Sequence, residues 1–85
     1  MRVQLRYFAS LREALGVEVE AIDLPEAVAT TDALRDWLAA RGGVWAEQLA
    51  PGRPVRVALA QRMAQPGTVL SEGQEVAFFP PVTGG

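Results

Sequence analysis

The sequence predicts an α+β fold in which a mixed sheet of four to five strands wraps around one main helix. Three observations predict this fold. The chain has 85 residues, which is enough for one domain but not for two. About half of its residues (49%) are hydrophobic and 21% are charged, which is a globular composition. Several segments with alternating apolar residues flank a single long segment with helical spacing.

The N-terminal segment 2–8 is the first predicted strand. Three apolar residues alternate with a second set that points the other way. The first set is Val3, Leu5 and Tyr7, and the second is Arg2, Gln4, Arg6 and Phe8. Because successive side chains of a strand point to opposite faces, we expect the first three to face the core and Phe8 to face away from it.

A short helix and a second strand are predicted next. Ser10 and Glu13 have the spacing of a capping box, so we expect Ser10 to cap a helix that ends at Gly16. Alternation then resumes over residues 17–24 and predicts a strand, which Pro25 ends.

The main helix is predicted to begin after Thr30, whose hydroxyl suits an N-cap, and to end at Gly42. Asp32 in its first turn interacts favourably with the helix dipole. Arg41 continues the spacing of the apolar face. The predicted buried stripe of this helix consists of Leu34, Trp37 and Leu38.

The second half of the chain is predicted to hold a further helical turn at 44–49 and three strands at 55–60, 62–65 and 74–79. In the last strand, Val76 and Phe78 are expected on one face. Ala77 and Phe79 are expected on the other. The sheet then has one face under the helix and one open face.

Composition excludes several classes of function. A formal net charge of −2 argues against nucleic acid as the main partner, since phosphate binding needs a basic excess. No apolar run is long enough to span a membrane, and the first residues lack a signal peptide, so we expect a cytoplasmic protein. The acidic residues are scattered without metal-ligand spacing, and we expect no bound metal.

Three residue types are missing altogether: Cys, His and Lys. Only carboxylates, Tyr7, hydroxyls and the termini remain for proton transfer, so we do not expect a self-sufficient hydrolase or transferase. Any catalysis that involves this chain would then need a partner protein that supplies the acid and base groups, so whether the chain is an enzyme stays open.

The last six residues differ from the rest and divide the chain into a domain, 1–79, and an expected flexible tail, 80–85. Two prolines hold the tail extended, and two glycines leave its end without a Cβ atom, which suits entry into a narrow channel. Fully extended, the tail reaches about 20 Å. It consists of Pro80, Pro81, Val82, Thr83, Gly84 and Gly85.

Residues 76–85 resemble the signature ending of the molybdopterin synthase small subunit family. Residues 6–16 are similar to the first strand and short helix of that family, and Ala33-Leu34-Arg35 and the Trp45 segment resemble its middle. The chain departs from the family at Ala60-Gln61, where Asn-Gln is common and a residue that tolerates a left-handed turn is lost. The resemblance implies a ubiquitin-like β-grasp fold.

The resemblance also implies a function and its site. An activating enzyme would use ATP and Mg²⁺ to adenylate Gly85 and then convert it to a thiocarboxylate, while this chain binds no cofactor itself. The large subunit, in an expected heterotetramer of two small and two large subunits, would receive the tail and pass the sulfur to cyclic pyranopterin monophosphate, building the molybdopterin dithiolene. The residues expected to insert are Gly84, Thr83, Val82, Pro81 and Pro80.

A partner interface is expected on the open face of the sheet. In a β-grasp sheet the first and last strands are neighbours, so Phe8 and Phe79 should lie side by side, with Ala77 widening the patch. Alternatively, a loop or the tail stem covers these rings. We expect Arg6 and Arg12 to be solvated or to contribute only rim contacts.

Two other functions remain open on the sequence. One alternative is a ubiquitin-like protein modifier, and the other is a sulfur carrier for another pathway. Both would use the same activated terminus. A plain interaction module with an inert tail is the third alternative.

Overall fold

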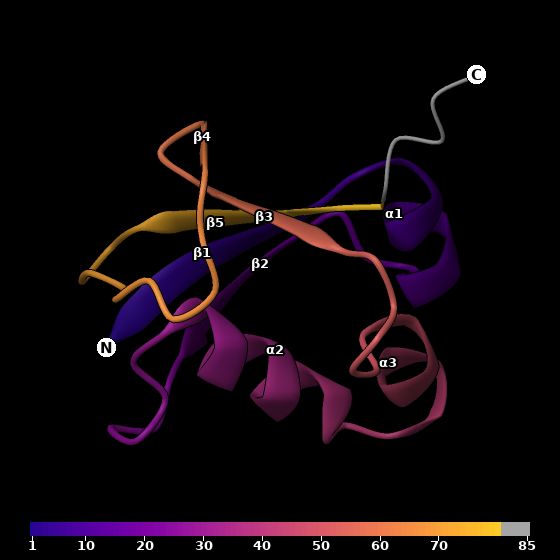
Figure 1. Ribbon diagram of the computed structural model, residues 1–85, viewed down its shortest axis with the longest axis horizontal. Coiled ribbons are helices and arrows are strands. Elements are labelled where there is room, and N and C mark those ends of the chain that lie inside the picture. The colour runs from indigo at the N-terminus through magenta and orange to yellow at the C-terminus, as the bar shows by residue number, and fades with distance from the viewer. Residues whose placement is uncertain (81–85) are drawn as a thin grey trace.

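A five-stranded mixed sheet forms one layer of the structure, and helix α2 packs across one of its faces (Figure 1). The computed structural model describes residues 1–80, so the predicted tail positions 81–85 lie outside the described residues. The elements are β1 (Arg2–Tyr7), α1 (Ala9–Leu15), β2 (Val19–Asp23), α2 (Thr31–Ala39), α3 (Gly43–Gln48), β3 (Arg56–Leu59), β4 (Arg62–Met63) and β5 (Glu75–Phe79).

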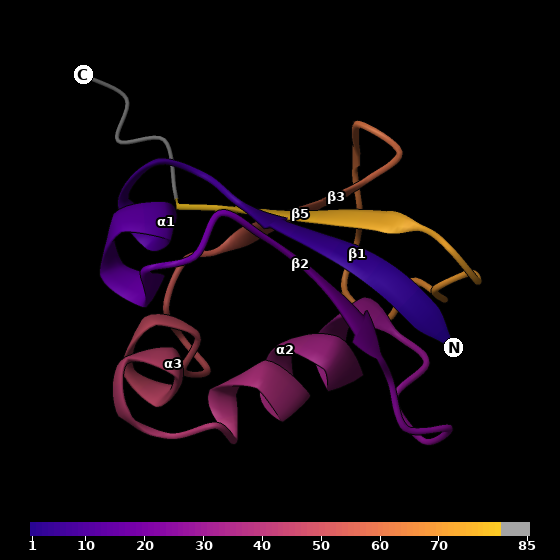
Figure 2. The same ribbon diagram turned by 180° about the vertical axis from the view of Figure 1, so that it is seen from behind.

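The strands lie in the order β2-β1-β5-β3-β4. The first and last strands are parallel neighbours, with Tyr7 opposite Phe78. The pairs β1–β2, β3–β5 and β3–β4 are antiparallel. The parallel pair at the centre needs a crossover connection, and the chain between β1 and β5 supplies it by passing below the sheet as α2 (Figures 1 and 2).

The core lies between the sheet and α2, as the alternation predicts. Val3, Leu5 and Tyr7 of β1 are all at most 1% exposed. Val76 and Phe78 of β5 are fully buried beside them. Burying these side chains removes their apolar surface from water and is the main favourable term in folding. The core is completed by Leu11, Leu24, Val28, Leu34, Leu38, Leu49, Leu59 and Leu70.

Helix α2 confirms most of the predicted local signals. The Thr30 hydroxyl accepts a hydrogen bond from the Ala33 amide at 3.2 Å, as an N-cap does. Leu34 and Leu38 are fully buried, but Trp37 is only partly buried at the edge of the core. The helix ends at Ala39, before Gly42, because Gly42 with its φ of 80° serves as the N-cap of α3 instead.

The capping box predicted at Ser10 is wrong. Helix α1 begins at Ala9, and its N-cap, two residues before Ser10, is Phe8, which makes no side-chain capping bond. The Phe8 carbonyl accepts from the amides of Leu11 and Arg12, so Ser10 lies inside the first turn. The end of the helix is as predicted, since Gly16 adopts a φ of 75°.

Strand β2 is an edge strand, and two of its apolar residues, Val19 and Ala21, face outward. Val19 is 48% exposed, and Ala21 is exposed as well. Glu20 and Ile22 are half-buried on the side of α2, and Leu24, just beyond the strand, is buried there. The acidic residue can face inward because it has partners there, described below.

The turn between β3 and β4 carries the departure from the family pattern. Ala60 and Gln61 both adopt positive φ, at 49° and 66°. A two-residue hairpin loop demands this backbone, which suits Gly and Asn far better than Ala. The chain therefore forms a left-handed turn with a residue that is strained in it.

Candidate functional site

Two stacked phenylalanine rings mark the place where the predicted tail leaves the domain. The rings of Phe8 and Phe79 have centroids 4.6 Å apart and planes inclined by 7°. Phe8 directly follows β1 and Phe79 ends β5, so the parallel pairing of these strands brings the rings together. The predicted juxtaposition is confirmed. Their contact with a partner stays a prediction.

Ala77 lies on the same face but offers little surface. It is 7% exposed, and its neighbour Ala58 on β3 is 5% exposed. Both have short side chains among longer ones, with Arg6 opposite Ala77 on β1. Any contact of Ala77 with a partner would therefore be small, and it too stays a prediction.

The stem of the tail begins against α1. Pro80, the last described residue, is half-buried and lines a cavity of about 280 Å³ together with Ser10 and Leu11 of α1. Pro54 and Val55, which precede β3, close its other side. The predicted site residues Pro81, Val82, Thr83, Gly84 and Gly85 lie outside the part of the chain that the structure describes.

Beneath the ring pair, Tyr7 links the core to a charged network. Its ring stacks on Phe78, with centroids 5.8 Å apart, and meets Trp45 edge-on at 5.4 Å. Its hydroxyl donates to Glu20 Oε1 at 3.0 Å. Burial and the neighbouring Glu20 carboxylate raise the pKa of Tyr7 far above its ordinary value, so the phenol stays protonated in the folded protein.

Arg41 completes this network from beyond the end of α2. Its Nη1 lies 2.9 Å from Glu20 Oε1. The guanidinium also lies over the rings of Trp45, 4.3 Å from the centroid, and of Trp37, at 5.6 Å. These contacts neutralise Glu20 and attach the α2–α3 connection to β2.

A second arginine, Arg35 of α2, holds the turn before β3. It donates to the carbonyl oxygens of Leu49, Ala50 and Arg53 at 3.0, 2.7 and 2.6 Å. Burial lowers the pKa of Arg35, but a guanidinium stays charged at any ordinary pH. The turn carries Pro54 and Val55, so Arg35 also positions one wall of the cavity beside the stem.

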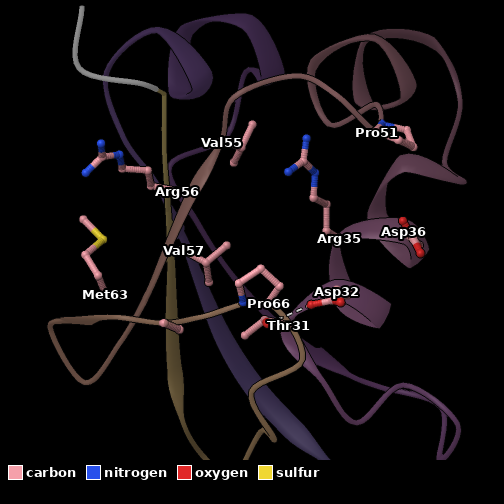
Figure 3. Close-up of a pocket in the computed structure, with 11 residues that line it drawn as sticks. Thr31, Asp32, Arg35, Asp36, Pro51, Val55, Arg56, Val57, Met63 and Pro66 are labelled. Atoms are coloured by element: carbon pink, nitrogen blue, oxygen red, sulfur yellow. Dashed lines mark hydrogen bonds between the residues drawn. The ribbon is translucent and has the colours of Figure 1, made fainter. Parts of the chain in front are cut away.

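Arg35 lies in the larger cavity, of about 590 Å³, which opens between α2 and β3 (Figure 3). Val55 and Val57 form its sheet side, and Asp32 lies on α2. Asp32 accepts hydrogen bonds from the Thr31 hydroxyl and the Gly67 amide, so its carboxylate and the Arg35 guanidinium are both already used within the fold. Asp36 and Arg56 also line the cavity.

Residues 1–80 contain no group of three or more acidic, His or Cys side chains able to hold a metal. Within the same range, none of the helices has the length and apolar character needed to cross a bilayer.

Sequence reasoning missed the environments of three charged residues. Glu20 was one of several scattered carboxylates, and Arg6 was expected to be solvated or to make rim contacts, whereas Arg6 Nε is buried. For Arg41 there was a signal, because it follows Leu34 by seven residues and so continues the inner face of the helix. Nothing local to Glu20 or Arg6 indicates which strand lies beside them.

Residues 5–85 match the ThiS family. The chain belongs to this family. A relative from Haemophilus influenzae, the molybdopterin synthase sulfur carrier subunit, is 43% identical over 79 residues, covering 93% of this chain and 94% of the relative. The protein of the same name from Escherichia coli is 39% identical over 85 residues, covering 98% and 99%. These identities place the chain with the molybdopterin synthase sulfur carrier subunits.

Solved structures share the fold over nearly the whole chain. A protein–protein complex of subunits 1 and 2 of molybdopterin-converting factor from Helicobacter pylori contains a chain with a TM-score of 0.68 and 26% identity, with full coverage of both chains. The small archaeal modifier protein 1 of Haloferax volcanii has a TM-score of 0.64 and 25% identity, covering 95% of this chain and 98% of its own. The expected ubiquitin-like β-grasp fold is confirmed.

Proposed function

We propose that this chain is the sulfur carrier of a molybdopterin synthase and that the carboxylate of Gly85 is the atom group that carries the sulfur. The observation that carries this proposal is the C-terminal motif, residues 76–85, which lies inside the range matched by the ThiS family. The two curated relatives, similar over nearly their whole length, bear the name of sulfur carrier subunits and support the same function.

The proposed loading takes two steps. In the first, an oxygen of the Gly85 carboxylate attacks the α-phosphate of ATP, held with Mg²⁺ by an activating enzyme, and pyrophosphate leaves. In the second, a sulfur donor supplies sulfide to the carbonyl carbon, the bond to the AMP oxygen breaks, and a thiocarboxylate remains. Adenylation is needed because a free carboxylate has no good leaving group.

The proposed unloading occurs on the large subunit. The tail would enter that subunit, and the thiocarboxylate sulfur would attack a carbon of cyclic pyranopterin monophosphate while a carbon–oxygen bond at that carbon breaks. Water would then cleave the bond between the Gly85 carbonyl carbon and the sulfur, which leaves the sulfur on the pterin and restores the Gly85 carboxylate. One carrier delivers one sulfur, so a dithiolene needs two loaded carriers. The acid and base groups must come from the partner, because this chain has no Cys, His or Lys.

Partner binding is proposed to use the face that carries Phe8 and Phe79. The ring pair flanks the start of the tail, and an apolar patch there would hold the domain while the tail is inserted. The name of the Helicobacter pylori structure, a complex of subunits 1 and 2, supports a large-subunit partner for this chain. We propose a heterotetramer of two small and two large subunits.

Intact-protein mass spectrometry tests the loading. After incubation with activating enzyme, ATP, Mg²⁺ and a sulfur source, we expect a mass increase equal to the replacement of one oxygen by sulfur, located at Gly85. A variant that lacks Gly84 and Gly85 is the control and should stay unmodified. An unchanged mass of the intact chain, under conditions that load the Escherichia coli relative, would contradict the proposal.

The modifier alternative predicts a different product. A modifier would be joined through Gly85 to lysines of other proteins, which gels of the native cell extract detect as larger adducts of this chain. We expect none under conjugating conditions. Adducts that disappear in the variant without Gly84 and Gly85 would show that the chain is a modifier.

A further inference from the structure

Arg6 is the one charged residue in a row of five residues on the outer face of the sheet. The register of four strand pairs sets this row, which runs across all five strands. Its two outer members are well exposed, Val19 at 48% and Met63 at 58%. In order, the row consists of Val19, Arg6, Ala77, Ala58 and Met63.

Arg6 has no well-formed hydrogen bond within the described residues. Its Nε is buried without any partner. Its Nη1 lies 3.8 Å from Glu75 Oε2, which is too long for a hydrogen bond, and both side chains are about 40% exposed. Its guanidinium lies 5.6 Å from the centre of the Phe8 ring. Arg6 is thus held beside the stacked rings while most of its donors remain available.

The position of Arg6 matters if this face docks against another protein. The rings of Phe8 and Phe79 would be covered in such a complex, and Arg6, in contact with Phe8, would lose water with them. A desolvated guanidinium is costly unless an acceptor on the other surface pairs with it, and a carboxylate matches its planar donors best. Glu75, whose Oε2 lies 3.8 Å from Arg6 Nη1, makes no hydrogen bond to it in this arrangement.

We infer that the large subunit presents an Asp or Glu side chain opposite Arg6, and that this pair sets the register of docking. The inference rests on the proposed function, because it requires a large subunit that covers this face. The surface of the large subunit that covers this face is then an apolar patch that contains one carboxylate, and not an apolar patch alone. Arg6 is a positioning residue, since it acts on the tail only by fixing the domain that carries it.

A single introduced lysine provides a direct test. The chain contains no Lys, so in the variant Arg6→Lys the only primary amines are the new side chain and the N-terminus. A carbodiimide, which joins amines to carboxylates without a spacer, should couple the introduced lysine to an Asp or Glu of the cognate large subunit. Peptide mass spectrometry then identifies both partners of the bond.

Arg62→Lys is the matched control for this cross-link. Arg62 is also an exposed strand residue, but its register partner Leu59 faces the core, so it lies on the opposite face of the sheet. We expect no coupling from this position to the large subunit. If the Arg6→Lys lysine couples only to Glu75 of its own chain in the complex, or not at all, the inference is overturned.

Binding measurements provide the second readout. Arg6→Met, which keeps an unbranched side chain but removes the guanidinium and its charge, should weaken binding to the large subunit by about tenfold and reduce the salt dependence of the affinity. Arg62→Met should change it less than twofold. Unchanged or tighter binding of Arg6→Met would overturn the inference.

The variant Glu75→Gln distinguishes a partner carboxylate that pairs with Arg6 from a partner cation that pairs with Glu75. If the large subunit presents a carboxylate to Arg6, removing the Glu75 charge leaves binding equal or tighter. A tenfold loss would mean that the partner offers a cation to Glu75, which overturns the inference. Failure of the wild-type chain to bind any large subunit would instead contradict the proposed function, so the two failures are distinguishable.

Discussion

At the scale of single residues, the apolar ring of Tyr7 and its polar hydroxyl lie in different environments. Its ring fills the core between Phe78 and Trp45, while its hydroxyl reaches the Glu20 carboxylate. Glu20 is held in turn by Arg41. A buried phenol beside a carboxylate is stable only while it keeps its proton, because ionisation would place two negative charges together out of water.

The raised pKa of Tyr7 predicts a loss of stability at alkaline pH. In the unfolded chain the phenol ionises at about pH 10. In the folded chain its pKa is higher, so its contribution is complete below about pH 10 and decreases above it, by up to about 1.4 kcal/mol per pH unit. Urea unfolding followed by tryptophan fluorescence between pH 8 and about pH 11 measures this slope.

The composition makes this prediction specific to one residue. The chain has one Tyr and no Cys or Lys, so it has no other type of side chain whose ordinary pKa lies in that window. Tyr7→Phe should be less stable at pH 7, because it leaves Glu20 without the hydroxyl, but it should lose little more between about pH 9 and 11. An equal alkaline slope in both proteins would refute this account of Tyr7.

At the scale of elements, the β3–β4 hairpin shows how a strand register can overrule a residue's preference. Leu59 pairs with Arg62 and Ala58 with Met63, which leaves only Ala60 and Gln61 for the loop. Both must then take positive φ. The pairing and the burial of Leu59 offset the strain at Ala60.

We expect Ala60→Asn to stabilise the protein by about 0.5–1 kcal/mol, because Asn adopts the left-handed region at lower cost than Ala. The free energy of unfolding in urea measures the effect. Ala27→Asn, in an exposed loop without positive φ, is the control and should change stability by less than about 0.5 kcal/mol. A destabilised Ala60→Asn variant would mean that the turn in solution differs from the one described.

At the scale of the whole molecule, one face of the sheet forms the core and the other face is open. One face is closed by α2 over the core. The other carries the stacked rings and Arg6 and lies next to the beginning of the tail. Both Phe8 and Phe79 lie outside the core cluster, so this face can change without loss of the fold.

Phe79→Ala tests that division. The variant should fold, with a stability loss of about 0.5–1.5 kcal/mol from the lost ring stacking and a further loss from the smaller buried area. Its affinity for the large subunit should decrease about 30-fold, as for a central interface residue. Circular dichroism and calorimetric titration measure the two effects.

Val69→Ala is a suitable comparison for Phe79→Ala, since Val69 is 69% exposed and lies outside the outer-face row. It should bind normally. If Phe79→Ala fails to fold, Phe79 belongs to the core and the assignment of the faces is wrong.

Much of the fold could be predicted from local patterns. Alternation in β1 and β5 assigned Val3, Leu5, Tyr7 and Phe78 to the core, because a strand turns successive side chains to opposite faces regardless of its neighbours. The N-cap at Thr30 and the end of α1 at Gly16 follow from bonds and φ angles within one turn. The cap of α1 failed because the chain leaves β1 directly into the helix, which makes Phe8 the cap in place of Ser10.

The sequence by itself determined the two-faced strands, the capped main helix and the terminal motif that indicates the family, since each depends on residues close together in the chain. Only the tertiary structure decided which charges meet. Glu20 reaches Tyr7 and Arg41, and Arg6 lies among apolar residues with its Nε lacking a partner within residues 1–80, because the strand order places β1 between β2 and β5. Such contacts join residues distant in sequence, and no local spacing records them.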